Sequence, residues 1–377
     1  MNHSPSPSPS PSPDPDPDPA EADAGPAEGA PVYAVGRVGV DFRSAARLDG
    51  FRRQLAEVPG GPPPDPGDAR QLYDHLVGNP WASSEVTWTL TLDSTPVYAL
   101  EAGPAVGMDW SGPLPGPAPD GTEEDEEERL ALLRRIAAAP PVHPVHRALR
   151  EALLGQSLPL GDPGRIGRLT VPGRLTERST RLFSGRTVPV VRVSAVGLAR
   201  WTETPLIAAA VDTVAEGITR RDRNPDDGHD DDGHAHDHDH EAVTGHVRAL
   251  LDKVYYQLRN PGRSAAERAL NHAVTETFLS GGLLGEGPLS AQRLPDALAP
   301  ATPGPTTPGP ATRGLCTLDT ITVARSPYCR ADSDCQDVMV RFFDPADDRR
   351  AAVTYVCTVD VSDELPVSLG PVHRFLG

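Results

Sequence analysis

The sequence predicts an α+β protein: an antiparallel β-rich body with helices packed on one side, flanked by disordered Pro-rich and acidic segments. Apolar residues alternate over 166–201 and 317–375, which is typical of half-buried antiparallel strands. Between these regions, over 202–280, apolar residues recur at helical spacing. The 377 residues include 43 Pro and 35 Gly and are only 38% hydrophobic, so long stretches cannot take part in a core.

The charge and the cysteine content limit the classes of partner. A formal net charge of −18 predicts that neither nucleic acid nor an anionic membrane is the main partner. The sequence has no apolar run of about 18 residues, so we expect no transmembrane helix, and it lacks the pattern of a secretory signal. Four unevenly spaced cysteines without an export signal are typical of a reducing compartment. We therefore expect a cytoplasmic protein.

The N-terminal part predicts a tail and a small subdomain. Residues 1–30 alternate proline with polar residues, which prevents helices and strand pairing and predicts a disordered Pro-rich tail. Residues 31–101 predict a small αβ subdomain in which Ser44 can cap the first helix. The expected elements are strand Val32–Val40, helix Ala45–Leu55, helix Gln71–Val77, strand Val86–Leu92 and strand Val97–Glu101.

Residues 102–164 predict an acidic loop and a helical connector. The acidic run 123–128 should lie in solvent, because like charges cannot be buried together. Two helices follow by their apolar pattern, Leu130–Ala139 and Val145–Leu154, and prolines at 140, 141 and 144 separate them.

Residues 165–375 predict the main domain, which begins with a β-meander over 166–201. We expect its turns at Pro172-Gly173 and Ser184-Gly185. Its many arginines indicate either a solvated sheet face or a groove for an acidic peptide, because the guanidinium fork matches a carboxylate. They are Arg165, Arg168, Arg174, Arg178, Arg181, Arg186, Arg192 and Arg200. The candidate peptide-binding residues are Arg174, Arg178, Arg181 and Arg186.

Three helices follow, with two predicted disordered insertions, 222–242 and 284–313. The helices are Leu206–Arg220, Val243–Leu258 and Ser264–Leu279, and Ser264 with Glu267 form a capping box. The first insertion alternates histidine with aspartate, a composition that binds zinc, nickel or copper weakly. A flexible tract has no supporting contacts around its ligands, so a solvated insertion is the alternative. The histidines are His229, His234, His236, His238 and His240.

The last segment predicts three strands, Leu318–Val323, Val338–Phe343 and Val353–Val361. The last two form a hairpin around the turn 344–350.

The four cysteines of the last segment leave three interpretations open. Cys329 and Cys335 lie in a polar loop, where they form a disulfide or neighbouring thiols that close it. Alternatively, some or all of Cys316, Cys329, Cys335 and Cys357 hold a structural zinc ion, although no C-x-x-C motif is present. The third interpretation is a reactive cysteine, for which no motif supplies a histidine partner. Neither G-x-S-x-G nor H-E-x-x-H occurs, so no motif predicts an enzyme.

Five stretches carry a family resemblance. They are VYAVGRVGVDFRSAARLDGF (32–51), PVYALE (96–101), LTVPGRLTERSTRLFSGRTVPVV (169–191), VYYQLRNPGRSAAERALNHAVTETF (254–278) and SPYCRADSDCQDVMVRFFDP with YVCTVDVSDELPVSLGPV (326–372). They resemble the carboxy-terminal region of the cyanobactin maturation protease PatG. That region has a short PatG domain, matched by 31–101, and a PatG C-terminal domain of unknown function, matched by 165–375.

The resemblance implies a role in the maturation of ribosomally made peptides. The family's parent is a subtilisin-like macrocyclase whose protease domain has no counterpart in this sequence. A similar domain ends the companion amino-terminal protease, so the shared part resembles a recognition or scaffolding module. We expect a non-catalytic accessory or interaction protein that binds a peptide or a partner enzyme, with a homodimer as a further option. The alternatives are a peptide-processing or peptide-modifying enzyme with an unrecognised site, and a metal-binding protein acting through the His/Asp tract.

Overall fold

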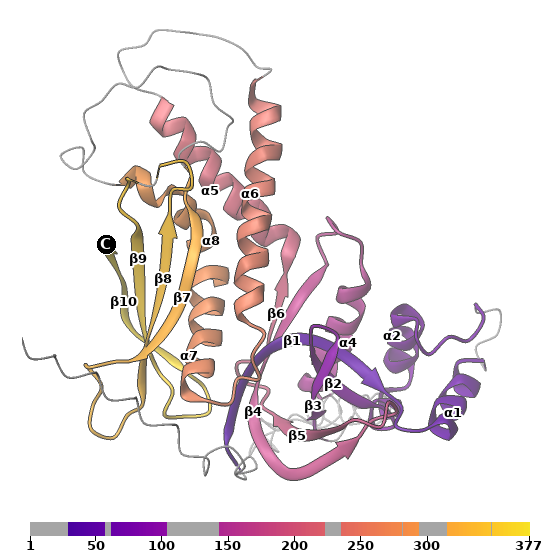
Figure 1. Cartoon of the computed structure of the whole chain (residues 1–377). Coiled ribbons are helices and arrows are strands. Elements are labelled where there is room, and N and C mark those ends of the chain that lie inside the picture. Colours follow the sequence, from indigo (N-terminus) through magenta and orange to yellow (C-terminus); the bar gives the residue numbers. More distant parts are fainter. Residues whose placement is uncertain are drawn as a thin grey trace, which may run out of the picture.

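Two β-sheets and the helices around them make up the described part of the chain. The computed structural model describes residues 29–56, 62–103, 143–222, 235–280, 282–293, 315–347 and 349–377. The first sheet has the strand order β1-β2-β3-β5-β4-β6, and the second has the order β10-β9-β8-β7. Figure 1 shows the two sheets on either side of α6 and α7.

The first sheet closes on itself as a barrel. β1 pairs with β2 on one edge and with β4 on the other, so strands β1 to β5 form a ring. Neighbours in the ring are antiparallel except β3 and β5, which are parallel. A five-stranded Greek-key barrel of this order is of the OB type. The strands of this sheet are β1 (Pro31–Asp41), β2 (Thr87–Leu92), β3 (Thr95–Glu101), β4 (Ile166–Arg181), β5 (Thr187–Val193) and β6 (Ala199–Thr202).

Gly36 marks the point at which β1 changes its partner. Residues 31–36 pair with β4, whereas residues 37–41 pair with β2. A Cβ atom at position 36 would lie 2.8 Å from the carbonyl oxygen of Thr91, so the strands approach this closely because the residue is glycine. The glycine within the predicted strand therefore allows the barrel to curve.

Helices cover the barrel where the strands leave it open. In the connection from β3 to β4, helix α4 buries Val145, Leu149 and Ala152 in one core cluster with the barrel residues Trp88 and Leu169. The connection from β1 to β2 carries two helices and one 3-10 helix. These elements are α4 (Pro144–Ser157), α1 (Ala45–Ala56), α2 (Ala69–Gly78) and η2 (Pro80–Ser84).

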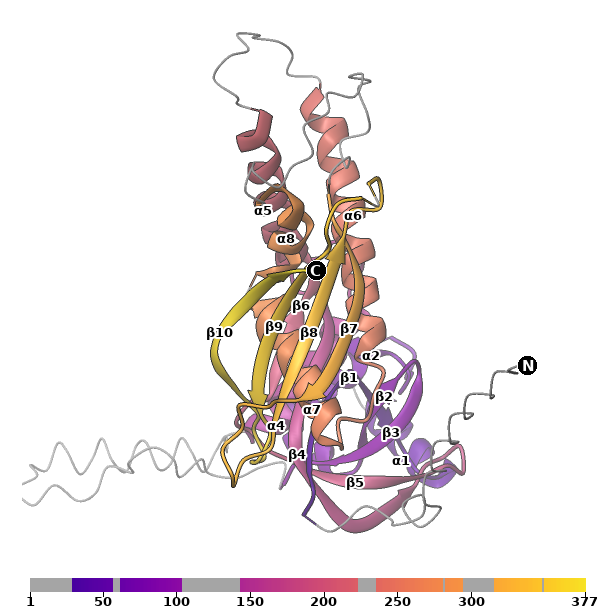
Figure 2. The ribbon, with the colours of Figure 1, turned by 60° about the vertical axis from the view of Figure 1, so that its left-hand side comes forward.

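The second sheet is covered by helices on one face. Alternate residues of β8 are buried, among them Val338, Val340 and Phe342. They share a core cluster with Leu250 of α6 and Phe278 of η3. Figure 2 shows the four strands in front of these helices. The α+β class and the packing of helices on one side are confirmed.

The elements of this second layer follow the barrel along the chain. Its helices are α5 (Glu203–Asp222), α6 (Ala235–Gln257), α7 (Ala265–Ala273), the π-helix η3 (Val274–Ser280), α8 (Leu283–Glu286) and the 3-10 helix η4 (Gly287–Arg293). Its strands are β7 (Thr317–Arg325), β8 (Cys335–Phe343), β9 (Val353–Asp360) and β10 (Val367–Leu376). No helix among the described residues is long and apolar enough to cross a membrane.

The strand grouping predicted from the sequence is wrong. The prediction joined 166–201 with 317–375, but β4, β5 and β6 belong to the first sheet, together with β1, β2 and β3. β4 also runs without a turn through Pro172-Gly173. This dipeptide marks a close approach, because a Cβ atom on Gly173 would overlap the carbonyl oxygen of Arg192. Alternation shows which residues form strands, but it does not show which strands pair.

Several predicted boundaries also differ. Helix α6 begins at Ala235, inside the predicted insertion 222–242. Residues 283–293 form α8 and η4 with buried Leu284 and Leu289, although 284–313 was predicted to be disordered. Strand β10 was not predicted as a separate element. The tail 1–28, the acidic run and the predicted helix Leu130–Ala139 lie outside the described residues.

Candidate functional site

Two neighbouring cavities lie where the barrel meets the helices, and we call them together the junction cleft. The larger cavity has a volume of about 340 Å³ and is lined by the loop before β4 and by the facing sides of α5 and α6. The smaller has a volume of about 160 Å³ and is lined by β1, the β2–β3 turn and the end of α6. Tyr255 of α6 lines both cavities. Concave sites at the junction of two structural units are common binding sites.

Arginines from three separate elements line the junction cleft. Arg37 on β1, Arg168 on β4 and Arg259, just after α6, line the smaller cavity. Arg165 and Arg248 line the larger one. Strand alternation explains why the side chain of Arg37 points outward, because its neighbour Val38 points into the barrel core.

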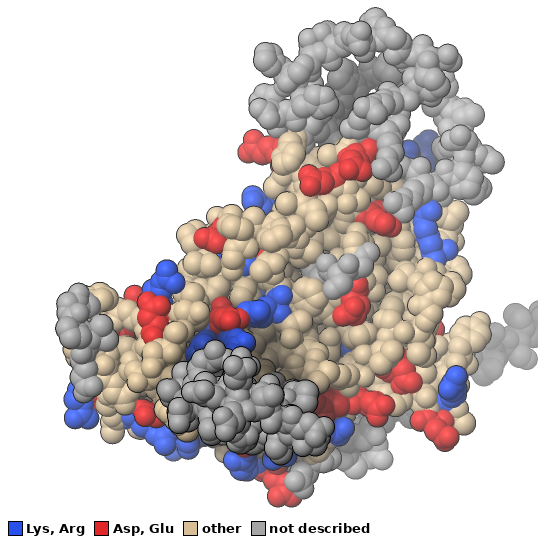
Figure 3. All heavy atoms as spheres, turned by 180° about the vertical axis from the view of Figure 1, so that it is seen from behind, with Lys and Arg blue, Asp and Glu red and all other residues tan. Residues whose placement is uncertain are grey.

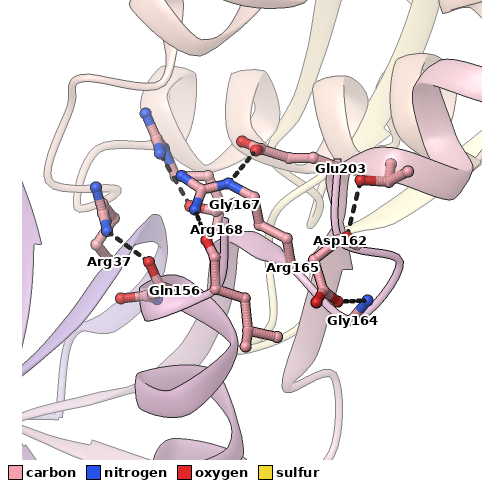
Figure 4. A network of polar contacts seen from close by, with 10 residues as sticks. Arg37, Gln156, Asp162, Gly164, Arg165, Gly167, Arg168 and Glu203 are labelled. Carbon is pink, nitrogen blue, oxygen red and sulfur yellow. Dashed lines mark hydrogen bonds and ion pairs between the residues drawn. The ribbon is translucent and has the colours of Figure 1, made fainter. Parts of the chain in front are cut away.

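A polar network fixes the wall of the larger cavity, and Figure 4 shows it at close range. Arg165 Nε donates to Glu203 Oε2 over 3.1 Å, and its Nη1 donates to the carbonyl oxygen of Leu158. The hydroxyl of Thr204 donates to the carbonyl oxygen of Asp162 over 2.9 Å. These contacts bind the loop before β4 to the first turn of α5, so the wall does not depend on packing alone.

Tyr255 occupies the centre of the junction cleft. The guanidinium carbon of Arg168 lies 4.5 Å from the centroid of its ring, which is a cation–π contact. Tyr255 is 8% exposed, and its hydroxyl has no hydrogen-bond partner among the described residues. Burial raises the pKa of Tyr255, so the group is a neutral phenol with a proton to donate.

The positive charge of the cleft is only partly neutralised. Arg165 pairs with Glu203, and Arg259 Nε lies 2.9 Å from Asp93 Oδ2. Within the described residues no carboxylate forms an ion pair with Arg37 or Arg168. Burial, followed by the charges of Arg168 and Arg165, lowers the pKa of Arg37. Figure 3 shows basic and acidic side chains around a hollow on the back of the molecule.

The four arginines predicted to bind a peptide lie away from this cleft, on the other part of β4 and on its hairpin with β5. Arg174 Nε lies 2.7 Å from Glu364 Oε2, and Arg178 pairs with Glu101. Arg181 ends β4, and Arg186 lies in the turn before β5. Two of the four are therefore engaged by carboxylates, and the peptide surface on them stays a prediction.

The four cysteines lie at three places, and each is a thiol and not half of a disulfide. The backbone N–H of Cys335 donates to Cys329 Sγ over 3.0 Å, and Cys329 Sγ donates to the carbonyl oxygen of Ser333 over 2.7 Å. These bonds close the polar loop without a disulfide. Burial and the neighbouring Cys329 raise the pKa of Cys335 to about 12, so this thiol is protonated and a poor nucleophile at neutral pH.

The structure does not bring the four cysteines together. Cys316 precedes β7, whose Thr317 pairs with Phe343 at one end of β8, whereas Cys335 begins β8 at the other end. A strand of this length separates its ends by roughly 25 Å. Cys357 lies in the core between helices and sheet. The four cysteines therefore do not surround one position, and among the described residues no group of three His, Cys, Asp or Glu could hold a metal ion. A zinc ion on Cys329 and Cys335 with further ligands stays a prediction.

The histidine tract falls largely outside the described part of the chain. His229 and His234 lie outside it, and His236 and His238 are described only as backbone of α6. His240 is exposed on α6. Metal binding by this tract stays a prediction.

Sequence reasoning did not find Arg37, Tyr255 or Arg259 as site residues. Each lies in an ordinary strand or helix pattern, and no spacing relates β1 to the end of α6. Arg165 and Arg168 were noticed as part of the arginine-rich meander, but the meander gave no sign that they face α6.

Comparison with known proteins finds two matches. The family model described as PatG C-terminal matches residues 237–375. A solved structure described as "PatG Domain of Unknown Function" has a TM-score of 0.63 and 30% sequence identity, and the match covers 92% of this chain and 99% of that one. A search of curated proteins gives no match.

Proposed function

The chain belongs to the family of PatG domains, and on this premise we propose that it is a non-catalytic accessory protein of ribosomal peptide maturation. It binds a peptide or a partner enzyme of a cyanobactin-like pathway. The family name supplies the pathway, because the matched domain is named after a cyanobactin maturation protein. The proposed binding role is supported by a structural feature of this chain, the junction cleft.

The observation that supports binding is the junction cleft. Its walls come from the barrel and from the helices, and hydrogen bonds such as Arg165 to Glu203 hold them in place without a ligand. A preformed cavity loses little conformational entropy when it binds. Its excess arginines favour an acidic segment of a peptide or of a partner protein.

The cysteine loop gives less support to an enzyme. The protonated Cys335 thiol would need a base, and no described histidine bonds to either Cys329 or Cys335. We therefore place the enzyme second, and turnover that Cys329→Ala abolishes in a folded protein would reverse this order.

Calorimetry with the full chain tests the proposal. Precursor peptides and purified neighbouring enzymes of such a pathway would be titrated separately, and mass spectrometry would follow the peptides over hours. We expect saturable binding of at least one partner with the peptide unchanged. Absence of binding to every one of them would reject the accessory role, and conversion of a peptide would replace it with catalysis.

A further inference from the structure

We propose that the junction cleft binds a peptide carboxylate, with Arg37 and Arg168 as the cationic partners and the Tyr255 hydroxyl as a third donor. This inference rests on the proposed function, since it specifies which chemical group of the partner the cleft holds. The group is a carboxylate beside an apolar side chain.

The Tyr255 hydroxyl gives the first argument. It belongs to a side chain that is 8% exposed, and no described group accepts its proton. Buried hydroxyls in folded proteins nearly always have a partner, because an unmet donor costs free energy. Tyr255 lines both cavities of the cleft, and a ligand group that reaches its hydroxyl would supply the missing acceptor.

The two unpaired guanidinium groups give the second argument. Arg37 donates from Nη2 to the carbonyl oxygen of Gln156 over 3.3 Å, and Arg168 donates from Nη1 to that of Gly167 over 2.9 Å. A guanidinium group has five N–H donors, so most donors of both residues are left for a ligand. Both residues line the smaller cavity. Burial, and after it the positive charge of Arg168, lowers the pKa of Arg37. An anion between them would remove this repulsion.

The remaining lining selects the class of anion. Five arginines and three acidic residues line the two cavities, which leaves a modest positive excess. A singly charged carboxylate matches this excess and the forked geometry of arginine. Ile207 and Leu251 line the larger cavity beside Tyr255, so an apolar side chain next to the carboxylate can be buried there.

Short synthetic peptides titrated into the full chain test this proposal. The probe is N-acetylated, C-amidated Ala-Leu-Glu-Leu-Ala, compared with the same peptide carrying Gln in place of Glu. A third peptide, Ala-Leu-Leu-Leu-Ala with a free C-terminus, shows whether a terminal carboxylate serves as well as a side-chain one. We expect the Glu peptide to bind at least about tenfold more tightly than its Gln counterpart, as for hydrogen bonds to a charged group.

Variants of the cleft assign the binding to named residues. Arg37→Gln and Arg168→Gln should each weaken binding of the Glu peptide about tenfold, and Tyr255→Phe about three- to tenfold. Arg168→Lys should recover only part of the loss, because it keeps the charge but not the fork. The matched control is Arg52→Gln, which removes an equal charge from an exposed i,i+3 pair with Asp49 on α1. Circular dichroism would confirm that each variant folds. If Tyr255→Phe does not fold, the exposed Arg37 still provides a test of the cleft.

Equal affinity for the Glu and Gln peptides, or equal weakening by Arg52→Gln and Arg168→Gln, would overturn the inference. No binding of any of the three peptides at millimolar concentration would also overturn it. If a precursor peptide binds the wild-type chain and the cleft variants alike, the accessory function stands and this assignment fails. If no precursor peptide or enzyme binds at all, the proposed function fails first.

Discussion

The backbone of Gly262, which follows α6, lies directly against the backbone of Tyr33 in β1. Tyr33 N donates to the carbonyl oxygen of Gly262 over 2.9 Å. Gly262 has a φ of +65°, and a Cβ atom there would overlap the carbonyl oxygen of Tyr33. The stretch NPGRSAAERALN, which carries much of the family resemblance, therefore joins the helices to the barrel.

Substitution of Gly262 should destabilise the protein strongly. We expect Gly262→Ala to lower the free energy of unfolding by about 2–4 kcal/mol, because it adds both a left-handed backbone strain and a steric overlap. Gly282→Ala is the matched control, since Gly282 has a φ of +79° but a Cβ atom added to it would meet nothing within 4 Å. Urea unfolding measures both, and equal losses would show that the contact with Tyr33 contributes nothing.

Asn271 should act together with Asn260 where the segment 260–271 contacts β1. Asn271 is fully buried, and its Nδ2 donates to the carbonyl oxygen of Tyr33 over 2.7 Å and to Asn260 Oδ1 over 3.0 Å. Asn271→Ala should cost about 2–3 kcal/mol, because it leaves buried polar groups without partners. A double-mutant cycle with Asn260→Ala should give a coupling of about 1 kcal/mol. Strict additivity of the two losses would contradict a shared network.

His272 should make the fold sensitive to acid. Burial lowers the pKa of His272 to about 4 from an ordinary value of 6.5. The unfolded chain therefore binds this proton more tightly than the folded chain, and the free energy of unfolding falls as the pH drops from about 6.5 to about 4. The full effect of this one residue is roughly 3 kcal/mol.

A His272→Gln variant checks this dependence by urea unfolding at several pH values. Burial also lowers the pKa of His146 and of His246, so the variant should keep part of the acid sensitivity. A slope between pH 4 and pH 6.5 that matches the wild type would show that His272 does not contribute. His373→Gln is the control, because His373 is an exposed residue of β10.

The cysteines should react at very different rates. Cys329 is partly exposed, whereas Cys316, Cys335 and Cys357 are buried. A thiol reagent should therefore modify one residue rapidly in the folded protein and all four after unfolding, and Cys329→Ser should remove the rapid phase.

Fewer than four thiols after unfolding would indicate a disulfide or a bound metal, and recovery of the missing thiols with a chelator would identify the metal. Deletion of residues 226–241 would then show whether retained zinc comes from the cysteines.

Local patterns in the sequence were enough to predict most elements. Alternation located β1, β2 and β8 within a few residues, and the capping box at Ser264 fixed the start of α7. The barrel was not predicted, because its closure depends on the pairing of β1 with β4 across more than a hundred residues. Pro172-Gly173 was predicted to be a turn, because a Pro-Gly dipeptide is typical of turns and the sequence does not show that the backbone of Gly173 lies against Arg192 of the next strand, β5.

The site was harder to predict than the fold. Arg37, Arg168 and Tyr255 come from three elements that are far apart in the sequence and line one cavity. No spacing in the sequence predicts that these three side chains lie close together. The arginine-rich meander was a true signal of positive charge. The sequence does not show, however, that Arg178 forms an ion pair with Glu101 or that Arg168 stacks on Tyr255.

The most direct test of the junction cleft is hydrogen exchange of the full chain with and without a bound precursor peptide, read by mass spectrometry. We predict slower exchange in three segments that line the cleft: 158–168, 203–207 and 248–259. Protection confined to the β4–β5 hairpin around Arg181 and Arg186, or to the exposed edge strand β10, would contradict the account and place the partner on another surface.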